Sequence, residues 1–369
     1  MAQQAGSSRL LRGINESAAL RLLLDRGPLT RGDLRELTGL AKPTTSDVMR
    51  RLQDAGLARV IGRTSGGPGP NADIYDVNPD AAYAAAVSLR EKDSSLVTAV
   101  CDLSGEVRAR VTTPLAQDPV RSVADAVRGA CRAAKVDRLD HVQLGVPGAH
   151  HDGTIRYVDV PGWSRPGLID DIRARLATLV SVDNDVNLAA AAERARGVAK
   201  DAESFALLWL GEEGLGLGID LGGRIIRGAR GGAGEIGYMP AGPDGDFQEL
   251  VGGPAILALA RKHGIGADRA ATAATDERLL RPLASRIAYG IAAVVAVLDP
   301  ELVVLAGEVG QAGGAALADA VGTALRELSV LDTEIAATTL TEDAVLLGAL
   351  DTTLTTIRTA LLTRRQETP

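Results

Sequence analysis

The chain has 369 residues, of which 46% are hydrophobic and 2% aromatic, and its formal net charge is −7 at pH 7. This length predicts two or three domains with a well-buried core, and the scarcity of aromatic side chains argues against base stacking on single-stranded nucleic acid. We find no apolar run of the length that spans a bilayer, so we expect a cytoplasmic protein without a membrane partner. The two cysteines, Cys101 and Cys131, lack the spacing of metal ligands and are expected to be buried thiols.

The start of the chain predicts a tail followed by a helix. Residues 1–12 are polar, show no apolar period and are too short for a signal peptide, so they are predicted to be disordered. A helix capped by Asn15 or Ser17 should follow. Its apolar surface comes from four leucines: Leu20, Leu22, Leu23 and Leu24.

The next segment, from Leu29 to Leu57, has the spacing of two helices joined by a tight turn. Thr30 is a favourable N-cap for the first helix, and Gly39 permits the turn. Pro43 suits the first turn of the second helix, in which Val48 and Leu52 are spaced to face the core. The pattern predicts a helix-turn-helix, and an ordinary solvated helical hairpin is the alternative.

A strand hairpin should follow the second helix. Residues 58–63 and 73–78 have strand character and flank a Gly/Pro-rich loop. This arrangement is typical of a winged helix-turn-helix that binds double-stranded DNA. The residues predicted to contact DNA are taken to point outward from the second helix or the hairpin: Lys42, Thr44, Thr45, Ser46, Arg50, Arg51 and Arg63.

These side chains divide by chemistry. The short hydroxyls near the helix N-terminus are assigned to base edges, where a recognition helix makes its specific contacts. The basic side chains are assigned mainly to phosphates. Residues 1–76 carry 11 Lys and Arg against 8 Asp and Glu, about +3, which leaves about −10 for the remainder. We therefore expect modest, salt-sensitive non-specific affinity for DNA.

From Ala82 onward, strand-like and helix-like segments alternate, which predicts a mixed α/β domain. The fold class is therefore α/β. We expect three parts: a tail over 1–12, a winged helix-turn-helix over 13–78, and the α/β domain over 79–369.

Three motifs in the α/β part are informative together: GVPGAHHDGTIRYVDVPGW (145–163), VDNDVNLAAAAE (182–193) and GLGLGIDLGGRIIRGARGGAGEIGYMP (214–240). In this order, behind a winged helix, they resemble the repressor, open reading frame, kinase (ROK) family. That family contains sugar kinases and sugar-responsive repressors, such as those for xylose and N-acetylglucosamine. The resemblance implies a two-lobed actin-like ATPase fold, with lobes of roughly 79–187 plus the C-terminal helix and 188–344, and a sugar in the cleft.

The resemblance also implies a set of sugar-binding residues: Asn184, Asp185, Glu235, Tyr238 and Gln248. The first two are the pair that meets sugar hydroxyls in the family. The residues alone favour another role for them, a turn asparagine and a capping aspartate before the helix that begins at residue 186. Gln248 stands where the family has a glutamate if no gap is introduced. A one-residue deletion would place Glu249 there instead.

The family's metal and nucleotide features are expected to be absent. Tyr238 replaces a histidine that contacts sugar and zinc, and residues 240–256 contain no cysteine, so we predict no zinc and no other cofactor. The first phosphate loop is replaced by residues 87–96, which lack glycine and carry Glu91. Further departures occur in the second phosphate region and at a usual glycine pair: Glu212, Glu213 and Ala306–Gly307. We predict that kinase activity has been lost.

Together these features predict a transcriptional regulator, by resemblance a repressor of carbohydrate-related genes. Its expected partners are operator DNA, a sugar or sugar derivative, and further copies of the chain in a homodimer or homotetramer. Two alternatives are open. One is a sugar kinase with an accessory DNA-binding domain, and the other is a ligand-independent DNA-binding protein whose second domain only oligomerises.

Overall fold

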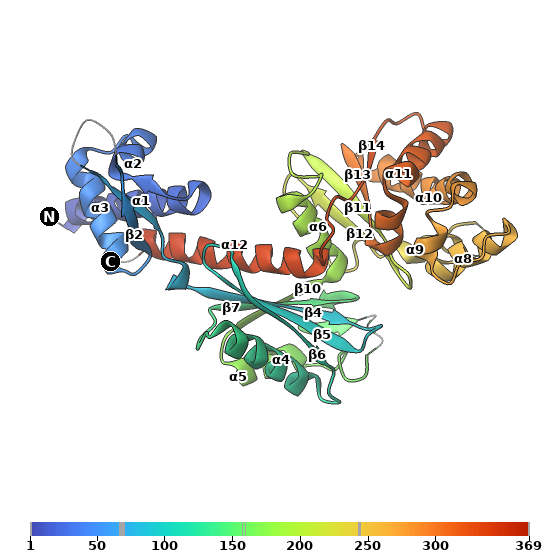
Figure 1. Cartoon of the computed structure of the whole chain (residues 1–369), viewed down its shortest axis with the longest axis horizontal. Helices are drawn as coiled ribbons and strands as arrows, with labels where there is room; N and C mark the ends of the chain where they lie inside the picture. Colours follow the sequence, from blue (N-terminus) through green and yellow to red (C-terminus); the bar gives the residue numbers. More distant parts are fainter. Residues whose placement is uncertain (1, 66–70, 157, 159, 243–244, 368–369) are drawn as a thin grey trace.

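The computed structural model describes residues 2–65, 71–156, 158, 160–242 and 245–367. An N-terminal module (residues 2–78) lies at one end of the molecule, and two sheets with their helices form the remainder (Figure 1). Helix α12 (Ala344–Glu367) runs from the second of these sheets back to the N-terminal module, so both chain ends lie near that module.

The N-terminal module has three helices and a small antiparallel sheet of strand order β1-β3-β2. The helices are α1 (Ala2–Arg26), α2 (Arg31–Thr38) and α3 (Lys42–Asp54). The strands are β1 (Leu29–Thr30), β2 (Ala58–Arg63) and β3 (Asp73–Val77). Helix α2 begins with a capping box, in which Thr30 Oγ1 accepts from Asp33 N (3.2 Å) and the Asp33 carboxylate accepts from Thr30 N (2.8 Å). It ends at Gly39, whose φ is +71°.

The expected tail and first helix cap are wrong. Helix α1 begins at Ala2, so residues 2–12 are helical and neither Asn15 nor Ser17 is a cap. Ser17 instead lies inside the helix, where its hydroxyl donates to the Leu362 carbonyl of α12 (2.8 Å). The Ser17 side chain thus joins α1 to α12 and does not cap a helix. Part of the Gly/Pro-rich loop, residues 66–70, lies outside the described residues.

The first large sheet has the order β10-β7-β4-β5-β6. Its strands are β4 (Tyr83–Arg90), β5 (Ser95–Asp102), β6 (Val107–Pro114), β7 (His141–Val146) and β10 (Leu179–Asn184). Strands β4, β7 and β10 are parallel, so their carboxyl ends meet at one edge. Helices α4 (Pro119–Ala134) and α5 (Leu168–Leu176) cover one face, and α12 covers the other.

The second sheet has the order β12-β11-β13-β14. Its strands are β11 (Ser204–Leu210), β12 (Leu215–Leu221), β13 (Leu302–Ala306) and β14 (Glu334–Ala337). Helix α6 (Asp185–Arg196) packs on one face. The other face carries α7 (Phe247–Val251), α8 (Gly253–Lys262), α9 (Ala270–Ala273), α10 (Glu277–Leu298) and α11 (Gly307–Leu328).

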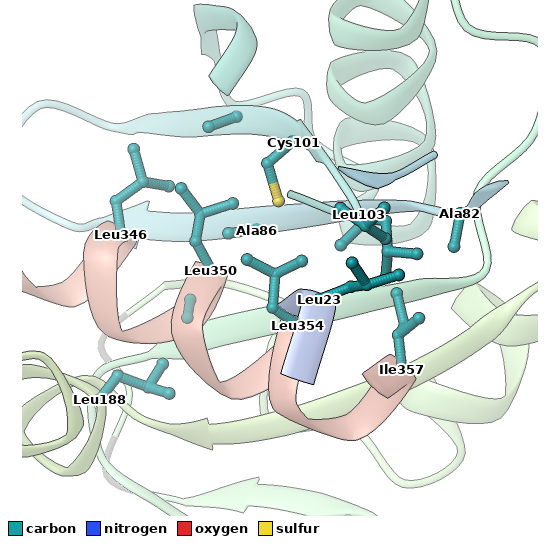
Figure 2. Packing of buried hydrophobic residues seen from close by; sticks show 14 of the residues in the cluster. Leu23, Ala82, Ala86, Cys101, Leu103, Leu188, Leu346, Leu350, Leu354 and Ile357 are labelled. Atoms are coloured by element: carbon teal, nitrogen blue, oxygen red, sulfur yellow. The ribbon is translucent and has the colours of Figure 1, made fainter. Parts of the chain in front are cut away.

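Helix α12 contacts all three parts of the molecule. Figure 2 shows its apolar side chains, among them Leu350, Leu354 and Ile357, facing the first sheet and Leu23 of α1. On the opposite side α12 crosses α6 closely, because a Cβ at Gly348 would lie 1.7 Å from the Leu188 carbonyl oxygen. One continuous core therefore joins the N-terminal module, the first sheet, α6 and α12.

Two helices of the described residues, α10 and residues 344–365 of α12, are long and apolar enough to cross a membrane by length and composition. The expectation that no such run exists is therefore wrong. Both helices are packed inside the structure, α10 against α11 and α12 against α6 and the first sheet. A buried core helix satisfies the same length and composition criteria as a membrane span.

Candidate functional site

A cavity of about 590 Å³ lies between the two sheets, within the size range of small-molecule sites. It is lined by the turn after β4, by residues 147–148 after β7 and by the start of α6 after β10. The turn between β11 and β12 and the start of α11 after β13 close it from the other side. Ligands of α/β proteins commonly bind at the carboxyl ends of parallel strands.

All five residues predicted to bind sugar line this cavity: Asn184, Asp185, Glu235, Tyr238 and Gln248. They come from the junction of β10 and α6, from the loop after β12 and from α7. Glu249, the alternative to Gln248, is exposed and does not line the cavity. The structure thus brings together residues separated by more than sixty positions, while their contacts with sugar stay a prediction.

Asn184 is mainly engaged with the protein itself. Its side-chain oxygen accepts from Val186 N (2.8 Å) and Asn187 N (3.1 Å), and its amide donates to the Gly148 carbonyl (3.0 Å). It is therefore the N-cap of α6, the role that the residues alone assigned to Asp185. Only one amide hydrogen is left for a ligand, so Asn184 chiefly fixes the residue that follows it.

Asp185 and Glu235 are the two half-buried carboxyls of the cavity with altered acidity. Burial, together with the negative charges of Glu91 and Glu235, raises the pKa of Asp185 to about 7. The hydrogen bond that Val186 N donates to the Asp185 carboxylate lowers this pKa and so offsets part of the shift. Burial also raises the pKa of Glu235. A carboxyl with a pKa near 7, as Asp185 has, can donate or accept a hydrogen bond near neutral pH, which suits the hydroxyls of a sugar.

Tyr238 and Gln248 lie nearer the mouth of the cavity. Tyr238 is 66% exposed, so it can border a ligand only at the cavity's edge. The Gln248 amide donates to the Glu213 carbonyl (3.0 Å), which ties α7 to the turn between β11 and β12. This contact holds together two segments of the lining.

The three regions expected to have lost phosphate binding also meet in the cavity. They are the turn at Glu91, the turn at Glu212 and Glu213, and the start of α11 at Gly307. The Glu212 carboxylate accepts from Ala270 N (2.9 Å) and from Ala271 N (3.1 Å). The Glu212 carboxylate thus ties the turn between β11 and β12 to the first turn of α9.

Sequence reasoning missed several cavity residues, among them Trp209 and Asp343. Asp343 accepts hydrogen bonds from Arg90 Nη2 (2.5 Å) and Arg110 Nη2 (3.4 Å), and also from Leu346 N at the start of α12 (3.2 Å). Its position just before a long helix was the available signal. Among the described residues, no group of three or more His, Cys, Asp or Glu is placed to hold a metal ion.

The N-terminal module corrects one predicted DNA contact. Thr45 is only 2% exposed and its hydroxyl donates to the Ala41 carbonyl (3.2 Å), so it faces the core and cannot reach a base. Thr44 and Ser46 are half-buried and Lys42 is exposed. These three positions remain open to DNA contact.

The arginines of α3 form ion pairs with its own carboxylates. Arg50 pairs with Asp47 (2.6 Å) and Asp54 (2.9 Å), and Arg51 Nε donates to Asp47 (2.8 Å). Hydrogen bonds from Arg50 and then Arg51 lower the pKa of Asp47. Exposed pairs of this kind contribute at most about 1 kcal/mol, so DNA phosphates can replace them.

Two further arginines connect the module to its surroundings. Arg63 pairs with Asp73 across the β2–β3 hairpin (2.9 Å) and is otherwise exposed. Arg51 Nη1 lies 3.7 Å from the buried Glu16 of α1, and Arg365 Nη1 of α12 lies 3.8 Å from the same carboxylate. Glu16 therefore joins α3 to the end of α12, whose other end begins at the cavity.

A model of the ROK family matches residues 93–355. The DNA-binding transcriptional dual regulator NagC of Escherichia coli is 27% identical over 254 residues, which cover 66% of this chain and 61% of NagC. The chain therefore matches less than two thirds of the length of that relative.

Solved structures of a transcriptional regulator and of a sugar kinase share the fold. A ROK family transcriptional regulator, a homologue of the E. coli MLC protein, superposes with a TM-score of 0.75 at 21% identity and covers 97% of this chain and 99% of its own. The ROK hexokinase from Thermus thermophilus gives a TM-score of 0.62 at 26% identity and covers 75% and 99%.

Proposed function

Because the chain belongs to the ROK family, we propose that it is a DNA-binding transcriptional regulator, a repressor of carbohydrate-related genes, that responds to a sugar or sugar derivative. The N-terminal module is a winged helix-turn-helix for operator DNA, and the cavity between the sheets binds the effector. The protein acts in the cytoplasm as a homodimer or homotetramer. One observation carries this proposal: a single helix, α12, extends from the cavity to α1 of the N-terminal module, where Arg365 of α12 and Arg51 of α3 both lie close to the Glu16 carboxylate.

The DNA side rests on the shape and charge of α3. The capped α2, the turn at Gly39 and α3 have the order of a helix-turn-helix, with β2 and β3 as the wing. Thr44 and Ser46 at the start of α3 are assigned to base edges, and Lys42, Arg50 and the hairpin's Arg63 to phosphates. Arg51 has a second role through Glu16.

The proposed response to an effector rests on helix α12, which begins at the cavity and ends at the N-terminal module. Asp343, Ala344 and Val345 line the cavity at the start of α12, and Arg365 near its end contacts Glu16. A sugar that draws the two sheets together bears on the first turn of α12. The rigid helix then moves Glu16 and Arg51, which shifts the population of DNA-competent molecules.

A sugar kinase is the less favoured function, although a hexokinase shares the fold. Glu91, Glu212 and Glu213 line the parts of the cavity where family kinases are expected to bind phosphates. Each carboxylate repels a nucleotide phosphate. The other candidate is a DNA-binding protein that responds to no ligand. This function gives the cavity no role, so we favour it less.

DNA binding is tested by removing two exposed cations of α3. We expect Lys42→Ala with Arg50→Ala to weaken binding to selected operator DNA at least tenfold. The slope of log K against log salt should fall by about 2, since each phosphate contact contributes about 0.9. Fluorescence anisotropy at several salt concentrations measures both values.

Arg278→Ala is the matched control, because Arg278 is also exposed and paired with a nearby aspartate, Asp276, but lies on α10. It should leave affinity and salt slope unchanged. Equal affinity for the double variant and the wild type would contradict the assignment of α3 as the recognition helix.

A further inference from the structure

The cavity has a strongly unequal charge. Among its described lining residues, ten are Asp or Glu and two are basic, Arg90 and Lys92. A cavity of this composition carries a negative potential, which concentrates cations and excludes anions.

The two basic side chains, Arg90 and Lys92, do little to offset the negative potential of the cavity. The Arg90 guanidinium is bound to the Asp343 carboxylate at 2.5 Å, and that carboxylate also receives Arg110. Lys92 is exposed in the turn after β4 and has Asp93 as its neighbour, which also lines the cavity. A phosphorylated sugar would therefore meet few available cations.

The carboxylates at the inner end point to the kind of cation that fits. Asp185, on α6, and Glu235, on the loop after β12, both line the cavity, and no Lys or Arg forms a salt bridge with either among the described residues. The charge of Glu91, from the turn after β4, also acts on Asp185 and helps raise its pKa. These carboxylates are not grouped as metal ligands. They surround a space sized for a small organic molecule.

We propose that the effector is an unphosphorylated sugar or polyol carrying an ammonium group, which lies between Asp185 and Glu91 while its hydroxyls meet Glu235. This inference rests on the proposed sugar-sensing function and specifies its ligand. An ammonium supplies three donors and one positive charge, which matches several carboxylates that line one cavity. A phosphoryl group in the same place would be repelled.

The test compares matched probes on the full-length protein. Isothermal titration calorimetry and thermal shift are run with glucose, 2-amino-2-deoxyglucose, 6-amino-6-deoxyglucose and glucose 6-phosphate, and with the galactose and mannose equivalents. We expect at least one amino sugar to bind tenfold or more tightly than its neutral parent, and every phosphate to bind more weakly than its parent. Glu91→Gln should reduce the amino-sugar preference about fivefold or more, whereas Glu327→Gln, which removes the same charge from the exposed end of α11, should not.

The outcomes separate the two proposals. Neutral sugars that bind as tightly as their amino forms would overturn the ammonium inference and leave the sugar sensor standing. A phosphate that binds most tightly would overturn it in the same way. No binding by any probe would overturn both, because the cavity would then lack a sugar. An unchanged preference in Glu91→Gln would remove Glu91 from the proposed ammonium site.

Discussion

Asp185 shows how the position of one carboxyl governs its chemistry. It is the first residue of α6, held by the Asn184 cap and exposed to the cavity charges of Glu91 and Glu235. Its raised pKa of about 7 means that its neutral form is stabilised in the folded protein.

This shift predicts a pH-dependent stability. The folded pKa lies above the ordinary 3.8, so the carboxyl's favourable contribution is complete below about pH 4 and is lost as the pH rises through 7. Asp185→Asn should therefore raise the free energy of unfolding at pH 8 by roughly 1–3 kcal/mol, with no comparable gain at pH 4. Urea unfolding at both pH values measures the difference. An equal gain at both would indicate a packing effect and not ionisation.

Single residues also show what sequence can predict. The buried position of Thr45 follows from its spacing to Val48, Met49 and Leu52, which places all four on one face of α3. The prediction failed because polarity was given more weight than helical period. The hydrogen bond from the Asn184 amide could not be predicted, since its acceptor is the Gly148 carbonyl 36 positions away.

At the scale of elements, local signals predicted the short helices well. The capping threonine, the turn glycine and the early proline define α2 and α3, because each acts within a few residues. Helix α1 was predicted too short, since its N-terminal half lacks an apolar period. Nothing local to Glu16 and Ser17 shows that α12 packs beside them. The cavity is also lined by segments that lie far apart in the sequence. Only the resemblance to the family predicted that these segments come together.

Helix α12 is the element that joins effector and DNA in this account. Glu16→Gln removes the charge that Arg51 and Arg365 share, while keeping the side chain's size. We expect unchanged DNA affinity without effector and a response to effector at least threefold smaller. Anisotropy titrations with and without saturating sugar measure this response. Asp25→Asn, an exposed change on the same helix, is the control. A full response in Glu16→Gln would show that coupling takes another route.

At the scale of the whole molecule, charge is divided between the two functions. The N-terminal 76 residues carry about +3 and the remainder about −10. In the function proposed here, the local positive charge favours DNA phosphates, and the acidic remainder keeps DNA from the cavity. The continuous core through α12 keeps these oppositely charged parts mechanically connected.

The most direct test of the account is the affinity for operator DNA measured against effector concentration. The wild-type protein is titrated with labelled DNA at increasing amounts of the tightest-binding sugar of the probe series, beside Glu235→Gln. We expect the Kd for DNA to rise at least tenfold at saturating sugar, with a midpoint at the sugar's own Kd, and to stay constant in Glu235→Gln. A Kd for wild type that does not change while the sugar is bound would contradict the coupling of cavity and DNA.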